Sequence, residues 1–193
     1  PIFAFLSTMM KTHLDSSPVK SISFAAFVND FLQLTKFRLA LSVVFSSVAG
    51  YLLAVDQVEI KILIGLFIGG FAMVGASNAI NQLIEKDLDA LMNRTKSRPL
   101  PTFRMSVLVA AIIAIVLTVL GIMVLYAINV KTALFGLLSI FIYTCIYTPL
   151  KTISPLAVFV GAFPGAIPFM LGWVAATGEF GVCLLYTSPS PRD

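Results

Sequence analysis

Charged side chains are scarce in this sequence. Only 11% of its 193 residues are Asp, Glu, Lys or Arg, whereas 59% are hydrophobic. A soluble domain carries roughly a quarter charged residues, so this composition excludes an ordinary water-soluble protein. The long uncharged runs predict an all-α, polytopic transmembrane helix bundle, because backbone that spans a membrane must satisfy its own hydrogen bonds.

Cysteine and histidine, the side chains that form disulfides or bind soft metals, are also scarce. The two cysteines, Cys145 and Cys183, form no CxxC motif, which excludes a disulfide framework and a cysteine metal site. His13 is the only histidine, so the predicted spans offer no imidazole ligand to a haem iron. The formal net charge of +4 does not indicate a nucleic-acid partner, because the basic residues follow the pattern of membrane topology.

Five apolar stretches are each long enough to cross a hydrocarbon core of about 30 Å. The predicted spans are residues 39–55, 61–84, 105–127, 131–149 and 155–176. The first and third connections are short, whereas the second is long and charged. Before the first span, residues 19–35 have the pattern of an amphipathic helix, which predicts a helix lying in the membrane interface.

The positions of the basic residues predict the orientation of these spans. Ten of the 13 Lys and Arg residues lie before the first span, in the second connection, or just after the fourth span. Lys61 and Lys131 fall on the opposite side, and Arg192 lies in the C-terminal segment. Because basic loops stay in the cytoplasm, we expect a multi-pass protein of the cell inner (plasma) membrane whose N-terminus and second connection are cytoplasmic.

Three polar residues lie four positions apart at the end of the second predicted span: Asn81, Glu85 and Asp89. An α-helix turns about 100° per residue, so these side chains form one stripe about 12 Å long. A charged side chain at the bilayer centre costs about 2.5–3.5 kcal/mol, so acids beside a membrane span usually serve a cation or an ion pathway. Asp87 lies about 200° around the helix from Glu85 and is expected to face elsewhere.

The stripe suits a Mg²⁺ ion that carries a diphosphate. Mg²⁺ prefers oxygen ligands and is commonly held by one or two carboxylates together with substrate phosphates. Glu85 and Asp89 are the predicted carboxylate ligands, and Asn81 is predicted to ligate or orient. We treat these three residues as both the metal-binding and the catalytic set.

Basic residues near the stripe are candidates for binding the diphosphate. Arg94 and Arg98 follow it directly, and guanidinium groups match phosphate oxygens. The prolines of the RPLP run break the helix and are expected to fold this loop back over the site. Tyr147 and Lys151 lie four residues apart at the same predicted depth, at the end of the fourth span.

These motifs resemble the UbiA-type membrane prenyltransferases. The first acidic motif of that superfamily has the form Asn-x3-Asp-x3-Asp at the end of the second span. Its middle residue is glutamate here, at Glu85, as in the branch of protoheme IX farnesyltransferases (haem O synthases). The resemblance extends over about residues 32–178 through TKFRLALSVV, SNAINQLIEKDLDALMNRTKSRPLP and YTPLKTISPLAVFVGAFPGAIPFMLGWVAATG.

The resemblance implies a bundle of nine helices around a lipid-accessible cavity, of which this chain would hold about five. It implies transfer of a farnesyl group from farnesyl diphosphate to a vinyl group of haem b, with Mg²⁺ held by two acidic motifs. The second motif belongs to a sixth-helix region that this sequence does not contain, so we expect the chain alone to be inactive. We divide the sequence into an N-terminal cytoplasmic or interfacial segment (1–35), a partial membrane domain (36–181) and a tail that we predict to be non-native (182–193).

Two alternatives stay open on the sequence. One is a UbiA-type enzyme with an aromatic acceptor, as in quinone or chlorophyll synthesis, for which an aspartate at the position of Glu85 would be usual. The other is a membrane transporter or channel with an acidic site, which would place polar residues near mid-membrane. The predicted position of the acids at the interface, beside an arginine-containing loop, favours phosphate chemistry.

Overall fold

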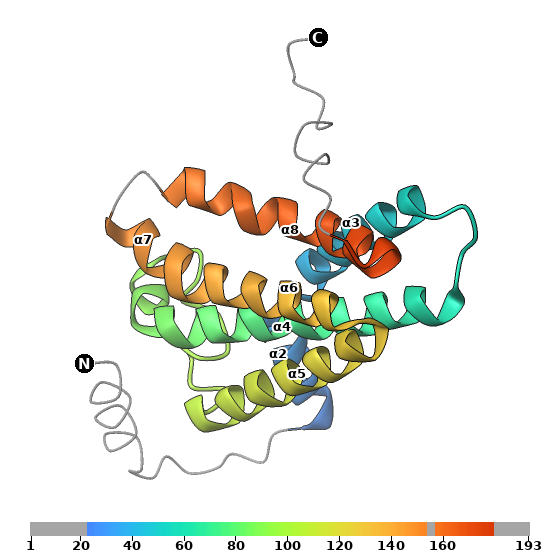
Figure 1. Cartoon of the computed structure of the whole chain (residues 1–193). Helices are drawn as coiled ribbons and strands as arrows, with labels where there is room; N and C mark the ends of the chain where they lie inside the picture. Colours follow the sequence, from blue (N-terminus) through green and yellow to red (C-terminus); the bar gives the residue numbers. More distant parts are fainter. Residues whose placement is uncertain (1–22, 154–156, 180–193) are drawn as a thin grey trace.

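The structure is a computed structural model that describes residues 23–153 and 157–179, and each regular element in these ranges is a helix (Figure 1). The predicted tail at 182–193 and most of the predicted N-terminal segment lie outside the described residues. The elements are α2 (Phe24–Leu34), α3 (Phe37–Ala54), α4 (Ile60–Leu91), α5 (Val107–Ile128), α6 (Val130–Phe141), the π-helix η1 (Ile142–Tyr147), α7 (Thr148–Ile153) and α8 (Ala157–Thr177).

Four stretches of helix are long and apolar enough to cross a membrane, namely α3, α4, α5 and the continuous run Val130–Lys151. They correspond to the first four predicted spans. The fifth predicted span corresponds to α8, in which side chains are described from Gly165 onward. These helices indicate a multi-pass membrane protein.

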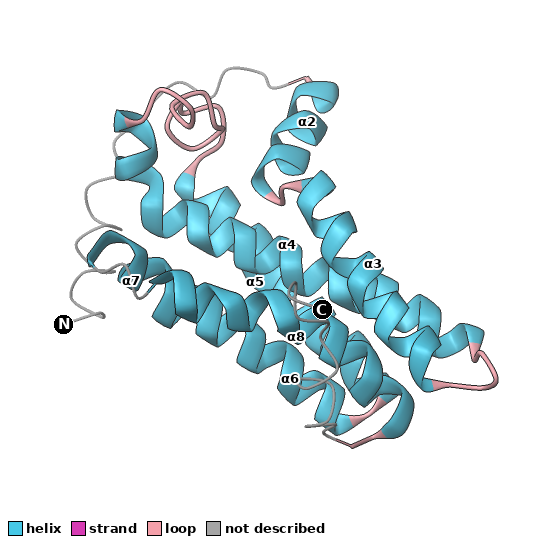
Figure 2. Ribbon diagram, turned by 90° about the horizontal axis from the view of Figure 1, so that it is seen from above, coloured by secondary structure: helices cyan, strands magenta, loops and turns pink. Residues whose placement is uncertain are grey.

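The long helices pack side by side, with α4 in the middle of the bundle (Figures 1 and 2). The most extensive contacts are those of α4 with α5 and of α3 with α8. A central apolar cluster joins α3, α4, α5, α6 and α8 through residues that include Tyr51, Leu66, Met73, Leu125 and Leu171. This packing fixes α4, which carries the acidic stripe, relative to the other helices.

Helices α3 and α8 approach each other through glycine. A Cβ atom added to Gly172 would lie 1.9 Å from the carbonyl oxygen of Ser47, and one added to Gly50 would lie 2.2 Å from that of Phe169. Neither distance is compatible with a side chain larger than hydrogen. The Ser47 hydroxyl also donates to the carbonyl of Pro168 at 2.7 Å. Small residues at helix contacts are typical of membrane bundles, where close van der Waals packing drives association.

A second apolar cluster lies at the polar end of α4. Leu34 of α2 is fully buried there with Leu100 and Met105 of the loop between α4 and α5. Arg104 strengthens the same contact, because its guanidinium pairs with Asp30 of α2 at 3.0 Å. The loop therefore folds back toward α4, as its two prolines predict.

The fourth predicted span is confirmed as a continuous helical run, Val130–Lys151, but this run is not α-helical throughout. Residues Ile142–Tyr147 form a π-helix between α6 and α7, in which the N–H of Thr148 donates to the carbonyl of Tyr143. Pro149 follows directly and has no N–H to continue an α-helical ladder. A π segment is a common adjustment at such a break, and it sets the rotation of α7.

Candidate functional site

The three residues of the acidic stripe share one buried face of α4. Asn81, Glu85 and Asp89 are 2%, 6% and 4% exposed. The side chain of Asp87 is 75% exposed and lies 4.0 Å from the ammonium of the neighbouring Lys86. The four-residue spacing therefore predicts the buried face correctly, and Asp87 points away from it. The predicted span ended at residue 84, whereas α4 continues to Leu91 and includes both acids.

Asp89 is paired with the loop that follows its own helix. The guanidinium of Arg98 donates to the Asp89 carboxylate at 2.5 Å, and the two side chains are 23% and 5% exposed. The Thr95 hydroxyl donates to the backbone carbonyl of Asp89 at 3.0 Å, which holds the start of the loop against the end of α4. The structure thus brings together two of the predicted residues through the expected fold of the loop.

Glu85 is paired with a different part of the chain. Its carboxylate forms an ion pair with the ammonium of Lys151 on α7. The same carboxylate accepts a hydrogen bond of 3.1 Å from the side-chain amide nitrogen of Asn81. The side-chain oxygen of Asn81 in turn accepts a hydrogen bond of 2.9 Å from the hydroxyl of Thr148. Asn81 therefore connects α4 with the start of α7 and orients the carboxylate of Glu85.

Tyr147 lies beside this ion pair. The ammonium of Lys151 lies 5.8 Å from the centroid of the Tyr147 ring, which is within the range of a cation–π contact. Tyr147 in turn stacks on Tyr143, with ring centroids 5.4 Å apart. The π-helix thus places a pair of aromatic rings next to the cation that contacts Glu85.

Arg94 is the one predicted site residue that the structure does not bring to the others. It is exposed and, within the part of the chain that the structure describes, makes no ion pair or side-chain hydrogen bond. Its predicted role in diphosphate binding has no geometric support here. The reason is the turn after Leu91, which carries Arg98 back toward Asp89 and leaves Arg94 on the outer side.

Three residues of the site were not predicted: Lys36, Asn78 and Gln82. Asn78 and Gln82 are buried on α4, each three residues before a member of the stripe, and their amide groups donate to backbone carbonyls at the end of α2. Lys36 follows these carbonyls. Burial lowers the pKa of its ammonium below the ordinary value; Arg98 and Lys151 lower this pKa further, whereas Glu85 and Asp89 oppose the shift. The spacing of Asn78 and Gln82 relative to the stripe was the signal available in the sequence.

The side chains that could ligate a metal indicate which metal ion the site could hold. Within residues 23–153 and 157–179, no group of three or more His, Cys, Asp or Glu side chains is arranged to hold a metal ion. Glu85 and Asp89 supply two carboxylates on one face, which fits a Mg²⁺ ion that takes its remaining ligands from substrate phosphates and water. Both carboxylates are engaged by Lys151 and Arg98, so binding such an ion would require these cations to turn toward the phosphates.

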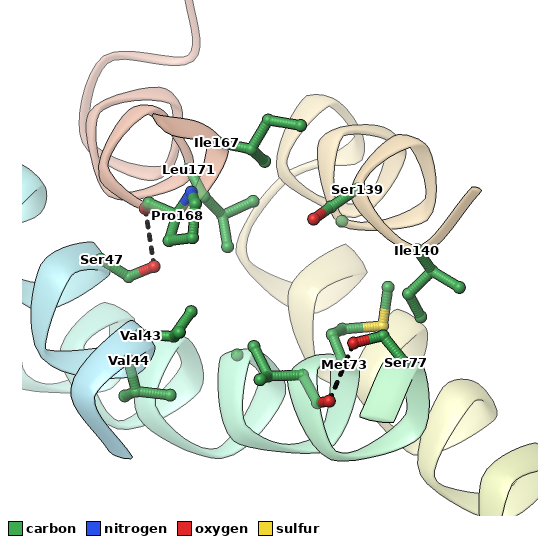
Figure 3. A pocket seen from close by; sticks show the side chains of 13 residues that line it. Val43, Val44, Ser47, Met73, Ser77, Ser139, Ile140, Ile167, Pro168 and Leu171 are labelled. Atoms are coloured by element: carbon green, nitrogen blue, oxygen red, sulfur yellow. Dashed lines mark hydrogen bonds between the residues drawn. The ribbon is translucent and has the colours of Figure 1, made fainter. Parts of the chain in front are cut away.

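A pocket lies in the apolar part of the bundle (Figure 3). It lies between α3, α4, α6 and α8. On α4 it is lined by Gly70, Met73, Val74 and Ser77, and Ser77 lies one helical turn before Asn81. Pro168 and Leu171 of α8 line the opposite wall. The same face of α4 thus presents polar side chains at its end and lines a pocket along its length.

These features define a helical membrane protein that carries buried, ion-paired carboxylates at one end of a long helix. The family comparison identifies the chain more closely. The model of the UbiA prenyltransferase family matches residues 43–191, and the chain belongs to this family.

Relatives with high sequence identity carry one common name. The protoheme IX farnesyltransferase of Flavobacterium psychrophilum is 62% identical over 168 residues, which are 86% of this chain and 54% of that protein. The one from Christiangramia forsetii is 65% identical, over 82% of this chain and 53% of that protein. The human mitochondrial protoheme IX farnesyltransferase is 42% identical, over 76% of this chain and 33% of that protein. The chain spans about half the length of the bacterial relatives.

Solved structures share the fold. A UbiA homologue from Archaeoglobus fulgidus, bound to DMAPP and Mg²⁺, superimposes with a TM-score of 0.69 at 22% identity, over 80% of this chain and 57% of that one. A digeranylgeranylglyceryl phosphate synthase gives a TM-score of 0.72 at 20% identity, over 78% of this chain and 53% of that one. The predicted fold class, a UbiA-like helix bundle, is confirmed.

Proposed function

We propose that the full-length protein to which this chain belongs transfers a farnesyl group from farnesyl diphosphate to a vinyl group of haem b, forming haem O. The observation that carries the proposal is the pair of buried carboxylates on α4, each held by a cation from a separate segment. The shared name of the relatives and the glutamate in the middle of the motif support haem b as the acceptor.

In this proposal the polar end of α4 binds the diphosphate. Glu85 and Asp89 would hold Mg²⁺, with Asn81 as an orienting residue or a ligand, and the ion would neutralise charge on the leaving group. The UbiA homologues solved with DMAPP or GPP together with Mg²⁺ support this choice of metal. Arg98 and Lys151 would turn from the carboxylates to the phosphate oxygens, and Tyr147 would stay beside Lys151.

In the proposed reaction, the C–O bond of farnesyl diphosphate breaks before the new carbon–carbon bond to haem b forms. The C–O bond of farnesyl diphosphate breaks, and its electron pair leaves with the diphosphate. Arg98 and Lys151 stabilise the charge that develops there. The vinyl carbon of haem b attacks the resulting allylic cation. The neighbouring carbon then takes hydroxide from water, a proton is released, and a hydroxyethyl substituent remains.

The farnesyl chain needs an apolar, water-excluding cavity next to the diphosphate. We place it in the pocket between α3, α4, α6 and α8, because the pocket follows the α4 face that ends in the stripe (Figure 3). The distribution of the basic residues supports a diphosphate site on the cytoplasmic side of the membrane.

The test uses this chain extended to the length of its relatives, because the resemblance implies a second acidic motif beyond this sequence. The extended protein, supplied with haem b, farnesyl diphosphate and Mg²⁺, is expected to form haem O, detected by mass spectrometry. Removal of Mg²⁺ with EDTA is expected to stop the reaction. Prenylation of an aromatic acid but not of haem b would instead identify the aromatic-acceptor alternative.

A further inference from the structure

The polar end of α4 holds more positive than negative charge. Its two carboxylates, Glu85 and Asp89, are already paired with Lys151 and Arg98. Lys36 adds a third cation that interacts electrostatically with all four groups and, within the described residues, forms no ion pair of its own. Three cations against two carboxylates leave one positive charge unbalanced in a partly buried place, which favours an anionic ligand.

The backbone of Lys36 is unusual for a lysine. Its φ and ψ are 50° and 57°, in the left-handed region, at the junction between α2 and α3. Glycine adopts this conformation without cost, and asparagine is more common there than lysine. A charged residue at a strained backbone position, beside a candidate site, points to a role for its side chain.

The junction is fixed to the helix that carries the stripe. Gln82 donates to the carbonyl of Leu34 at 2.8 Å and to that of Gln33 at 3.2 Å. Asn78 donates to the carbonyl of Thr35 at 3.1 Å. The last carbonyls of a helix lack donors from a following turn; the carbonyl of Gln33 also accepts from the N–H of Lys36 at 3.3 Å. Since Gln82 and Asn78 are both on α4, the backbone that carries Lys36 is set relative to the stripe.

We propose that Lys36 is a further diphosphate-binding residue and that Asn78 and Gln82 are the positioning residues that aim it. The inference rests on the proposed function of the site. Arg98 and Lys151 have to leave a carboxylate to reach a phosphate oxygen, whereas Lys36 does not. Lys36 is therefore the cation that meets an incoming diphosphate first, and the two paired cations follow when Mg²⁺ takes their carboxylates.

The test measures binding of inorganic diphosphate with Mg²⁺ to the extended protein by calorimetry. Lys36→Gly removes the cation and suits the left-handed backbone, so we expect the melting temperature to stay equal or rise. Affinity is expected to fall by about 10- to 100-fold, the effect of one charge-assisted hydrogen bond. Lys36→Arg keeps the charge and should retain most of the affinity. Lys96→Gln is the matched control, because Lys96 is exposed and, within the described residues, its ammonium bonds only to Asn93.

The outcomes separate this inference from the proposed function. If the unaltered protein binds diphosphate and Lys36→Gly binds it equally well, the role of Lys36 is overturned and the proposed function stands. If Lys36→Gly loses stability together with affinity, Lys36 is structural and the inference is also overturned. If the unaltered protein binds no diphosphate with Mg²⁺, the proposed function itself fails.

The positioning role has its own readout. Gln82→Leu should raise the KM for farnesyl diphosphate with little change in that for haem b. In the double variant with Lys36→Gly, the loss should be no larger than for Lys36→Gly alone, because Gln82 acts through Lys36. Additive losses would show that Gln82 serves the site by another route and would overturn this part of the inference.

Discussion

The two ends of α4 are held in different ways. In its first half, close packing dominates: a Cβ at Gly69 would lie 2.8 Å from the side chain of Leu125, and Met73 fills the space beside Gly121 and Gly136. In its second half, buried polar groups take over. Asn78, Asn81, Gln82, Glu85 and Asp89 bond to three other segments, namely the end of α2, the loop after α4, and α7. The apolar half builds the bundle, whereas the polar half builds a site at a cost in desolvation.

If the two halves of α4 correspond to two sides of a membrane, their ends are accessible from opposite compartments. Single cysteines at Asn93, after α4, and at Gln57, before it, are both placed on exposed positions. In a background without Cys145 and Cys183, a membrane-impermeant thiol reagent should label them from opposite sides of sealed vesicles. The effect should be nearly all-or-none. Labelling of both from one side would break the comparison and the predicted topology.

The packing of α3 against α8 should be the most sensitive feature of the apolar region. Gly172→Ala places a methyl group against the backbone of Ser47, which cannot move without separating the helices. We expect a loss of about 3 kcal/mol or more, seen as a lower melting temperature in detergent. Gly165→Ala in the same helix has no atom within 4 Å of the added group and should be neutral or stabilising. Equal losses for both would contradict the glycine argument.

The polar half should be less sensitive in stability than in function. Asn78→Leu or Gln82→Leu leaves carbonyls at the end of α2 without their donors, which should cost about 1–3 kcal/mol each. Asn93→Leu is the control, because Asn93 is exposed and should change the melting temperature little. If Asn93→Leu lowered the free energy of unfolding as much as Gln82→Leu, the hydrogen bonds of the buried amides would not explain the loss.

Features that depend on neighbours along one helix could be predicted from the sequence, whereas features that depend on contacts between helices could not. Hydropathy places four spans and the spacing places the stripe, because both depend on neighbours along one helix. The partners of Gln82 and Asn78 are 43–49 residues away in the chain, so only the packed structure pairs them. The π-helix before Thr148 and the exposed position of Arg94 also depend on tertiary contacts, and neither was predicted.

The central claim is that one face of α4 carries the metal and diphosphate site. Its most direct test is Mg²⁺-dependent farnesyl transfer to haem b by the extended protein with Glu85→Gln, Asp89→Asn or Asp87→Asn. The first two remove a buried carboxylate each, and turnover should fall at least about 100-fold. Asp87 is exposed on the opposite face, so its loss should change turnover by less than about threefold. Equal losses at all three positions, or full activity without Glu85 and Asp89, would contradict the account.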